Sequence, residues 1–362
     1  MKIAITIIAL VAFVAVLGFI ASQRLPKDFT LPMPTTKEAA QSDLPELGRM
    51  PEFVGIASWL NSEPLTKVDL RGTVVLIDFW TYSCINCIRT LPYVTGWYEK
   101  YKDRGFIIVG IHTPEFAFEK NRDNVAGAID RYNITYPVAQ DNEYATWNAY
   151  ANRYWPAHYL FDTQGNLRYT HFGEGEYDTT ENNIQSLLAE AGQSVTSDTI
   201  EGPSVPDFRQ IQTPETYLGY ERGTLLGSPE SVVRNDVQQY TSVAAPALNL
   251  FYLSGNWRVE AERTVAEETG VAIVYRYHAS TVNLVMSPPE SSNAKIRLTL
   301  DGQAVPANLR GSDVVEENGQ TYVTIDDERL YHLIDAQGDY AEHVLKLEFE
   351  TAGCAAYAFT FG

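Results

Sequence analysis

Hydrophobic and polar positions divide the chain into segments with different patterns. An apolar run from residue 3 to 21 comes first, and a polar segment containing Pro, Thr and Ser follows it. From about residue 51, short apolar runs alternate with stretches of helical period, and after about residue 210 almost only short strand-like runs remain. These changes predict five parts: a membrane anchor or signal segment (1–24), a tether (25–50), an α/β domain (51–195), a linker (196–210) and a β domain (211–362).

The first apolar run is long enough to span a membrane as a helix. No clean Ala-x-Ala site follows it, which favours an uncleaved single transmembrane helix over a removed signal peptide. Lys2 precedes the run and Arg24 with Lys27 follows it, so the positive-inside rule decides the orientation only weakly. Either interpretation exports the rest of the chain. We therefore expect the folded domains on the extracytoplasmic side of the cell membrane, in the periplasm or cell envelope.

The second pattern predicts an α/β domain. Apolar runs indicate strands, helical periods indicate helices, and Gly165 lies in the turn signal of a hairpin. A further hairpin is expected over 59–66, ahead of the first long strand. The order of the elements is typical of a thioredoxin-like layer arrangement. The expected strands are 74–79, 106–111, 157–162 and 167–172, and the expected helices lie at about 88–101, 119–132, 144–150 and 180–191.

Beyond the linker, short strand-like runs separated by turn signals indicate an all-β fold. Asp301-Gly302 and Asn318-Gly319 are two of these turn signals. The number and spacing of the strands suggest a β-sandwich of jelly-roll type. The candidate strands are 248–253, 257–261, 271–279, 281–286, 295–300, 322–325, 331–334, 344–350 and 357–361.

The candidate chemistry lies in Cys84-Ile85-Asn86-Cys87, where an apolar strand gives way to a helix. Two cysteines separated by two residues at such a junction are typical of a redox dithiol. At a helix N-terminus, free backbone N–H groups and the helix dipole favour the thiolate form of Cys84. Cys87 follows almost one turn later on the same face, within reach of a disulfide. We therefore expect Cys84 to attack a partner's disulfide and Cys87 to resolve the mixed disulfide.

Asp78 lies within the apolar strand that leads to the dithiol, where burying an ionised carboxylate is costly. A carboxyl group there could accept and return the proton of Cys87, and we include it among the catalytic candidates. His112, Glu115 and His158 lie near strand ends, and we interpret them as structural or exposed groups. Cys354 is expected to be a buried filler.

Composition excludes several classes of function. The formal net charge of −19 argues against nucleic acid and against adsorption to anionic lipids. Three cysteines make no disulfide framework, and no second cysteine pair completes a four-thiolate zinc site. The scattered histidines show no metal-ligand spacing with one another. We therefore expect no metal and no cofactor.

Several long motifs resemble the DipZ-type branch of the TlpA-like thioredoxins. The resemblance covers nearly everything from about residue 50 onward. It implies an extracytoplasmic thiol-disulfide oxidoreductase with a C-terminal domain similar to carbohydrate-binding modules. By the family pattern Pro156 is a cis-proline, and the backbone of Trp155 pairs with a bound partner segment. The motifs are 75–87 around the dithiol, 112–119, 154–157, 215–222, 329–334 and 356–362.

The sequence departs from the resemblance in two places. DipZ-type proteins often carry a multi-helix electron-conducting membrane domain, whereas a single hydrophobic run is found here. Electrons are then expected from a separate membrane protein of the CcdA/DsbD type, for delivery to disulfide-bearing envelope proteins. Cytochrome-maturation members carry Glu immediately after the cis-proline, but Ala157 occupies that position. The resemblance therefore gives no support for apocytochrome substrates.

Two other functions remain open. Thr81-x-x-Cys84 matches a peroxiredoxin motif and suggests a thiol peroxidase, although Ile77 stands where that motif has Pro. Alternatively, the protein binds glycans or docks in the envelope, with the α/β domain as a scaffold. Aromatic residues of the β domain could stack on sugars, but such residues in β-sandwiches are usually core. The aromatic candidates are Tyr217, Tyr220, Trp257, Tyr275, Tyr277 and Tyr331. The Ile85-Asn86 dipeptide does not decide the direction of electron flow.

Overall fold

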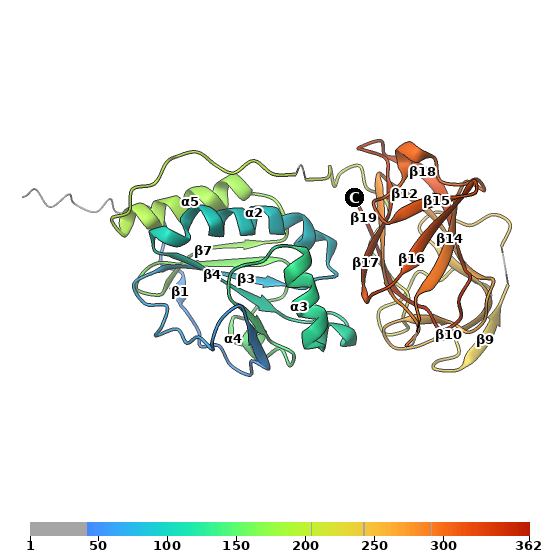
Figure 1. Ribbon diagram of the computed structural model, residues 1–362, viewed down its shortest axis with the longest axis horizontal. Coiled ribbons are helices and arrows are strands. Elements are labelled where there is room, and N and C mark those ends of the chain that lie inside the picture. The colour runs from blue at the N-terminus through green and yellow to red at the C-terminus, as the bar shows by residue number, and fades with distance from the viewer. Residues whose placement is uncertain (1–41, 204, 242, 291) are drawn as a thin grey trace, which may run out of the picture. The chain divides into compact units, whose positions relative to one another are not determined.

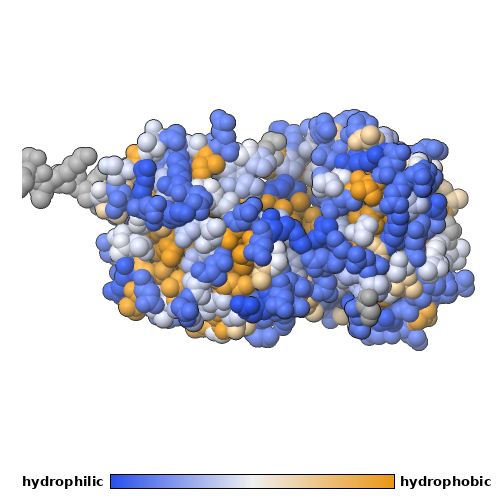
Figure 2. All heavy atoms as spheres, viewed as in Figure 1, coloured by the Kyte–Doolittle hydropathy of each residue, from blue (hydrophilic) through white to orange (hydrophobic). Residues whose placement is uncertain are grey.

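The computed structural model describes residues 42–203, 205–241, 243–290 and 292–362 (Figure 1). These residues belong to one compact unit, Ala40–Gly362. The predicted anchor and most of the predicted tether lie outside the described ranges. Within those ranges, no helix combines the length and the apolar character that crossing a membrane requires. Hydrophilic residues cover most of the face in Figure 2, as the high net charge leads one to expect.

A mixed seven-stranded sheet forms the centre of the α/β domain, in the order β1-β7-β6-β3-β4-β5-β2. The central strand β3 is buried along its whole length, which explains its continuous apolar sequence. It pairs in parallel with β4 and antiparallel with β6. The thioredoxin-like arrangement predicted from the element order is confirmed. The strands are β1 (Gly48–Arg49), β2 (Ser58–Leu60), β3 (Val74–Trp80), β4 (Phe106–His112), β5 (Val138–Gln140), β6 (Ala157–Phe161) and β7 (Asn166–Phe172).

Side chains alternate between the two faces of this sheet. Leu76 and Trp80 of β3 belong to a core with α2, α3 and α5, whereas Ile77 and Phe79 belong to a core with α4. Asp78 has the same parity as Leu76 and Trp80, so it faces the layer that contains α2. The helices are α2 (Ile85–Tyr101), η1 (Lys102–Arg104), η2 (Ala117–Lys120), α3 (Arg122–Arg131), α4 (Ala145–Ala149) and α5 (Tyr177–Glu190).

The hairpin expected over 59–66 is wrong. Strand β2 instead pairs antiparallel with β5, with Trp59 opposite Ala139. Residues 66–72 then form turns that lead into β3. The Ser-Glu-Pro sequence at 62–64 suggested a hairpin turn that pairs neighbouring segments. The strand that pairs with β2 is instead far away in the sequence.

The β domain is all-β, as predicted. Its twelve-stranded antiparallel sheet turns a corner within one strand, β10. The first half of β10 pairs with β12, and the second half pairs with β9 and β11. The strands are β8 (Thr216–Tyr217), β9 (Val237–Tyr240), β10 (Phe251–Val259), β11 (Thr264–Ala266), β12 (Val271–Ala279), β13 (Thr281–Ser287), β14 (Ala294–Leu300), β15 (Val314–Glu317), β16 (Gln320–Ile325), β17 (Arg329–Asp335), β18 (Ala341–Phe349) and β19 (Ala355–Phe361); η3 is Ala307–Leu309.

The corner in β10 explains why the sequence suggested two strands there. Gly255 has φ +92, and a Cβ at this position would lie 2.5 Å from Cγ1 of Val271. Glycine suits both this positive φ and this close contact. The expected break between the strands 248–253 and 257–261 is therefore a bend within one strand. The rings of Trp257 and Phe349 meet in the core with their centroids 5.0 Å apart.

We predict that Trp257→Ala lowers the free energy of unfolding by about 3–5 kcal/mol, because it empties a fully buried site. Chemical denaturation of this variant measures the loss. Val315→Ala, on exposed strand β15, is the control and is expected to change stability by less than about 0.5 kcal/mol. Equal losses in both variants would contradict the assignment of the core.

Candidate active site

The two cysteines of the dithiol differ in exposure. Cys84 is half-buried and caps the N-terminus of α2, where its Sγ accepts a hydrogen bond from the backbone N–H of Cys87 at 3.4 Å. Cys87 is buried within the first turn. Both thiols are free. A partner can therefore reach Cys84 first, as an attacking thiol requires.

Burial raises the pKa of the Cys87 thiol well above its ordinary value, with a further contribution from its hydrogen bond with Cys84. The negative charge of Asp78 acts in the same direction. Burial likewise raises the pKa of Tyr136, again with a contribution from Asp78. These groups are buried together beneath α2, and the raised pKa of Cys87 favours its protonated form.

Asp78 is 1% exposed, and the imidazole of His158 on the adjacent strand β6 lies beside it. The distance from His158 Nε2 to Asp78 Oδ1 is 3.3 Å. The sequence suggested a structural role for His158 and gave no reason to link it with Asp78. The antiparallel pairing of β3 and β6 brings the two residues opposite each other.

The Trp155–Pro156 peptide bond is cis, as the family resemblance implies. Pro156 directly precedes β6. The indole Nε1 of Trp155 donates a hydrogen bond to the carbonyl oxygen of Thr113 at 3.1 Å, and its ring packs against Trp147 with centroids 4.3 Å apart. These contacts fix the side chain of Trp155.

A second buried carboxyl group lies beside the dithiol. Glu119 of η2 accepts a hydrogen bond from the Ser83 hydroxyl at 2.5 Å and from the backbone N–H of Phe116 at 3.0 Å. Burial raises the pKa of Glu119 to about 7, although the hydrogen bond from Ser83 opposes this shift. Glu119 therefore holds the residue that immediately precedes Cys84.

Two of the motifs that carry the resemblance meet at Glu115. The Tyr217 hydroxyl lies 2.7 Å from Glu115 Oε1 and 2.8 Å from Glu215 Oε2. Arg222 donates to Glu115 Oε1 at 2.7 Å, and its guanidinium lies over the Tyr217 ring. One hydroxyl carries one proton, so it cannot donate to both carboxylates at once. Burial, together with the charge of Glu115, raises the pKa of Glu215 and favours its protonated form.

A cavity of about 260 Å³ adjoins Cys84, the more exposed cysteine of the dithiol. One wall comes from the start of α2, and the other comes from the residues before β8 and from the end of β19. Glu215 lines this cavity, which places an ionisable group of the β domain beside Cys84. Its lining residues are Cys84, Ile85, Asn86, Phe208, Ile211, Thr213, Glu215, Thr360 and Phe361.

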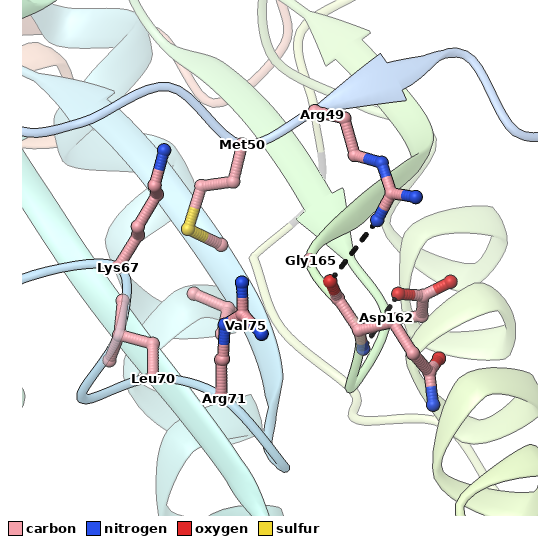
Figure 3. A pocket seen from close by; sticks show the side chains of 9 residues that line it. Arg49, Met50, Lys67, Leu70, Arg71, Val75, Asp162 and Gly165 are labelled. Atoms are coloured by element: carbon pink, nitrogen blue, oxygen red, sulfur yellow. Dashed lines mark hydrogen bonds between the residues drawn. The ribbon is translucent and has the colours of Figure 1, made fainter.

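Another cavity, of about 370 Å³, lies at the opposite end of β3 (Figure 3). Val75, the second residue of β3, lines it, whereas the dithiol follows the last residue of that strand. The side chains of Lys67, Met50 and Arg71 surround the opening (Figure 3). Its position separates it from the candidate site.

Other candidates take structural positions. Burial lowers the pKa of His112 to about 3, so this ring stays neutral beside Thr81, with 3.4 Å between Thr81 Oγ1 and His112 Nε2. Cys354 is buried in the core of the β domain. The described residues contain no cluster of three or more His, Cys, Asp or Glu side chains that could hold a metal ion.

The aromatic residues considered for a sugar platform are either buried or covered by an arginine side chain. Four of them, Trp257, Tyr275, Tyr277 and Tyr331, are buried. Tyr217 lies under Arg222, and Tyr220 lies under Arg234 at 4.7 Å. Stacking on a sugar would require these contacts to break.

Glu119 and Glu215 are the neighbours of the dithiol that the sequence did not single out. Both lie within motifs that carry the resemblance, but pattern alone gives no role to an isolated glutamate. The only feature of the sequence that could have drawn attention to these two glutamates is their position within the motifs. Glu119 ends the stretch that follows β4, and Glu215 begins the β-domain motif.

Comparison with known proteins identifies the family. The family described as "Thioredoxin like C-terminal domain" matches residues 213–362, and the "AhpC/TSA family" matches residues 49–170. The Thiol-disulfide oxidoreductase YkuV of Bacillus subtilis is 33% identical over 142 residues, which are 39% of this chain and 95% of YkuV. The chain belongs to the thioredoxin-like thiol-disulfide oxidoreductases.

Two further relatives of this oxidoreductase extend the comparison. Protein DipZ of Mycobacterium tuberculosis is 41% identical over 250 residues, which are 68% of this chain. The match spans only about a third (36%) of the length of DipZ. NHL repeat-containing protein 2 of Homo sapiens is 39% identical over 132 residues, covering 36% of this chain and 18% of that protein. The resemblance to DipZ is thus confirmed.

We predict that Glu119 makes the stability of the oxidoreductase depend on pH. The unfolded chain releases this proton near the ordinary pKa of 4.5, whereas the folded chain holds it to about 7. Between these values the folded state binds more protons, so its stability falls as pH rises, by about 3 kcal/mol in total. Urea unfolding over this pH range should show a smaller fall in Glu119→Gln than in the unsubstituted protein.

Glu143→Gln is the matched control, because the Glu143 side chain is 78% exposed. The control should keep the full pH dependence of the unsubstituted protein. An undiminished fall in Glu119→Gln would contradict the role assigned to this carboxyl group.

Proposed function

We propose that the protein reduces disulfides of cell-envelope proteins through Cys84 and Cys87. The observation that carries this proposal is the unequal burial of the two thiols, with Asp78 beneath them. In the first step the Cys84 thiolate attacks one sulfur of a partner disulfide. The S–S bond of the partner breaks, its other sulfur leaves as a thiolate, and a mixed disulfide with Cys84 remains.

In the second step Asp78 takes the proton of Cys87, and the resulting thiolate attacks the Sγ of Cys84. A Cys84–Cys87 disulfide forms and the mixed disulfide breaks. The second partner sulfur leaves as a thiolate and takes up a proton. Two electrons have moved from the dithiol to the partner. Burial of Cys87 supports this order, because its thiol is protected until the partner is bound.

The cavity beside Cys84 favours binding of the partner protein through an extended segment that contains the partner's own disulfide-bonded cysteine. Its volume of about 260 Å³ suits a short stretch of chain rather than a folded surface. Phe208, Ile211 and Phe361 offer it an apolar wall. Trp155, held beside the cis-proline, would pair through its backbone with the same segment. The β domain would thus contribute to partner choice.

Reduction requires a source of electrons for each turnover. We propose a separate membrane electron-transfer protein of the CcdA/DsbD type as this source. The apolar run at residues 3–21 supports attachment to the same membrane by one helix, with the folded domains on the extracytoplasmic side. The match to DipZ supports this setting.

We predict that Cys87→Ala accumulates mixed disulfides with envelope proteins, because the resolving thiol is gone. Non-reducing electrophoresis of cells whose thiols have been alkylated detects these adducts. Cys84→Ala is the matched control and should trap none, since it lacks the exposed attacking thiol. If Cys87→Ala traps no more partners than this control does, the exchange mechanism is wrong.

Two rates measured on the purified protein distinguish a disulfide reductase from the alternative, a thiol peroxidase. We expect reduction of a disulfide substrate to be at least about a hundredfold faster than consumption of hydrogen peroxide, in line with the size of effects that a positioned acid–base group supplies. Comparable rates at equal substrate concentration would favour a thiol peroxidase instead.

A further inference from the structure

Three ionisable side chains lie side by side across three strands of the α/β sheet. Asp78 of β3 pairs with His158 of β6, and His158 pairs with His171 of β7. Directly opposite residues of neighbouring strands project from the same face. This face is the one that packs against α2 and α5, so the row begins beneath the dithiol and ends at β7.

The burial of these side chains decreases along the row. Asp78 and His158 are each 1% exposed, whereas His171 is half-buried. The distance from Asp78 Oδ1 to His158 Nε2 is 3.3 Å, and the two imidazole rings lie with their centroids 6.2 Å apart. Both ring nitrogens of His158 are buried without a hydrogen-bond partner, as is Nε2 of His171. Such atoms are rare in folded proteins and call for an explanation.

No other strand offers Asp78 an ionisable partner among the described residues. On its other side Asp78 pairs with Gly110 of β4, and a Cβ there would lie 3.0 Å from the rings of Trp80 and Tyr136. A side chain at that position would press against both rings. The proton of Asp78 has one titratable neighbour within the sheet, which is His158.

The elements packed against the row bring further ionisable groups, among them buried Glu181 of α5, which accepts a hydrogen bond from Trp97 Nε1 at 3.2 Å. From α2 come the Cys87 thiol and the Trp97 ring, which meets His158 edge-on with centroids 5.8 Å apart. Tyr136, which precedes β5, is the other ionisable group near Asp78. Near His171, burial lowers the pKa of the ring and His158 adds to this effect, while Glu176, beside α5, opposes it.

We propose that His158 and His171 are positioning residues that carry the Cys87 proton from Asp78 to solvent. This inference rests on the proposed function and concerns only its second step. A buried carboxyl group that accepts a proton has to lose it before the next turnover. Imidazole accepts and donates protons near neutral pH, so histidines suit this task. One bridging water or one ring rotation spans the gap between the two rings.

The proton balance follows directly. When Cys87 attacks Cys84, its proton moves to Asp78 and the thiolate of the partner leaves. Asp78 then passes the proton to His158, which becomes an imidazolium and recovers its neutral form by protonating His171. His171 releases the proton to water at the half-exposed end of the row. No electrons move along the row.

A small aromatic disulfide, dithiobis(nitrobenzoate), tests the row without an identified partner. Mixed with the reduced full-length protein in a stopped-flow instrument, it releases one coloured thiolate when Cys84 attacks and a second when Cys87 resolves the adduct. The two phases report the two steps separately. We expect His158→Gln to slow the second phase by about tenfold at neutral pH and to leave the first unchanged, as loss of a proton-transfer group predicts.

His171→Ala gives a readout that a merely structural role would not move. Its second phase should slow similarly and recover when imidazole is added to the buffer, because the half-exposed end of the row can take up a free base. Thr170→Val is the matched control, since it changes the neighbouring residue of β7, which faces away from the row. It should keep both phases and show no response to imidazole.

The outcomes separate this inference from the proposed function. If the unsubstituted protein shows no second phase, the exchange mechanism itself fails. If both phases are present and the second phase of His158→Gln stays within about twofold of the unsubstituted rate, or if imidazole does not accelerate His171→Ala, the relay alone is overturned. Circular dichroism melting of each variant shows that the comparison is made on folded protein.

Discussion

Burial of one carboxyl group constrains the whole α/β domain. Asp78 lies in the middle of a strand with no exposed residue, where an unpaired charge is very costly. The sheet places His158 opposite Asp78 on one side, with 3.3 Å between His158 Nε2 and Asp78 Oδ1, and Gly110 opposite it on the other. The same burial keeps the Cys87 thiol protonated above it. The position of this carboxyl group thus bears on two neighbours, His158 beside it and the Cys87 thiol above it.

The loop before Cys84 depends on a second carboxyl group and on the β domain. Glu119 holds Ser83, while Glu115, four residues earlier, is held by Tyr217 and Arg222. The same β-domain motif brings Glu215 to the cavity beside Cys84. The second domain therefore contributes directly to the surroundings of Cys84. This arrangement gives a physical reason for two distant motifs to occur in one chain.

Much of this structure follows from local sequence patterns. The run at 74–79, apolar except for Asp78, indicated a buried strand, and the Cys-x-x-Cys after it indicated the start of a helix. Contacts between residues far apart in the sequence did not follow from these local patterns. The partner of β2 is set by β5, nearly eighty residues later, and the pairing of His158 with Asp78 is set by the register between β3 and β6. The break expected between the strands 248–253 and 257–261 was wrong, because the chain bends at Gly255 within the single strand β10.

The chemistry of the dithiol was predictable, but its direction was not. A strongly oxidising dithiol has its reduced form stabilised. Here burial keeps the Cys87 thiol protonated, so this sulfur adds no stabilised thiolate to the reduced form. The reduction potential of the Cys84–Cys87 couple, measured by equilibration with glutathione, tests the account most directly. We predict a value of about −270 mV, which suits a reductant, and a value near −120 mV would contradict it.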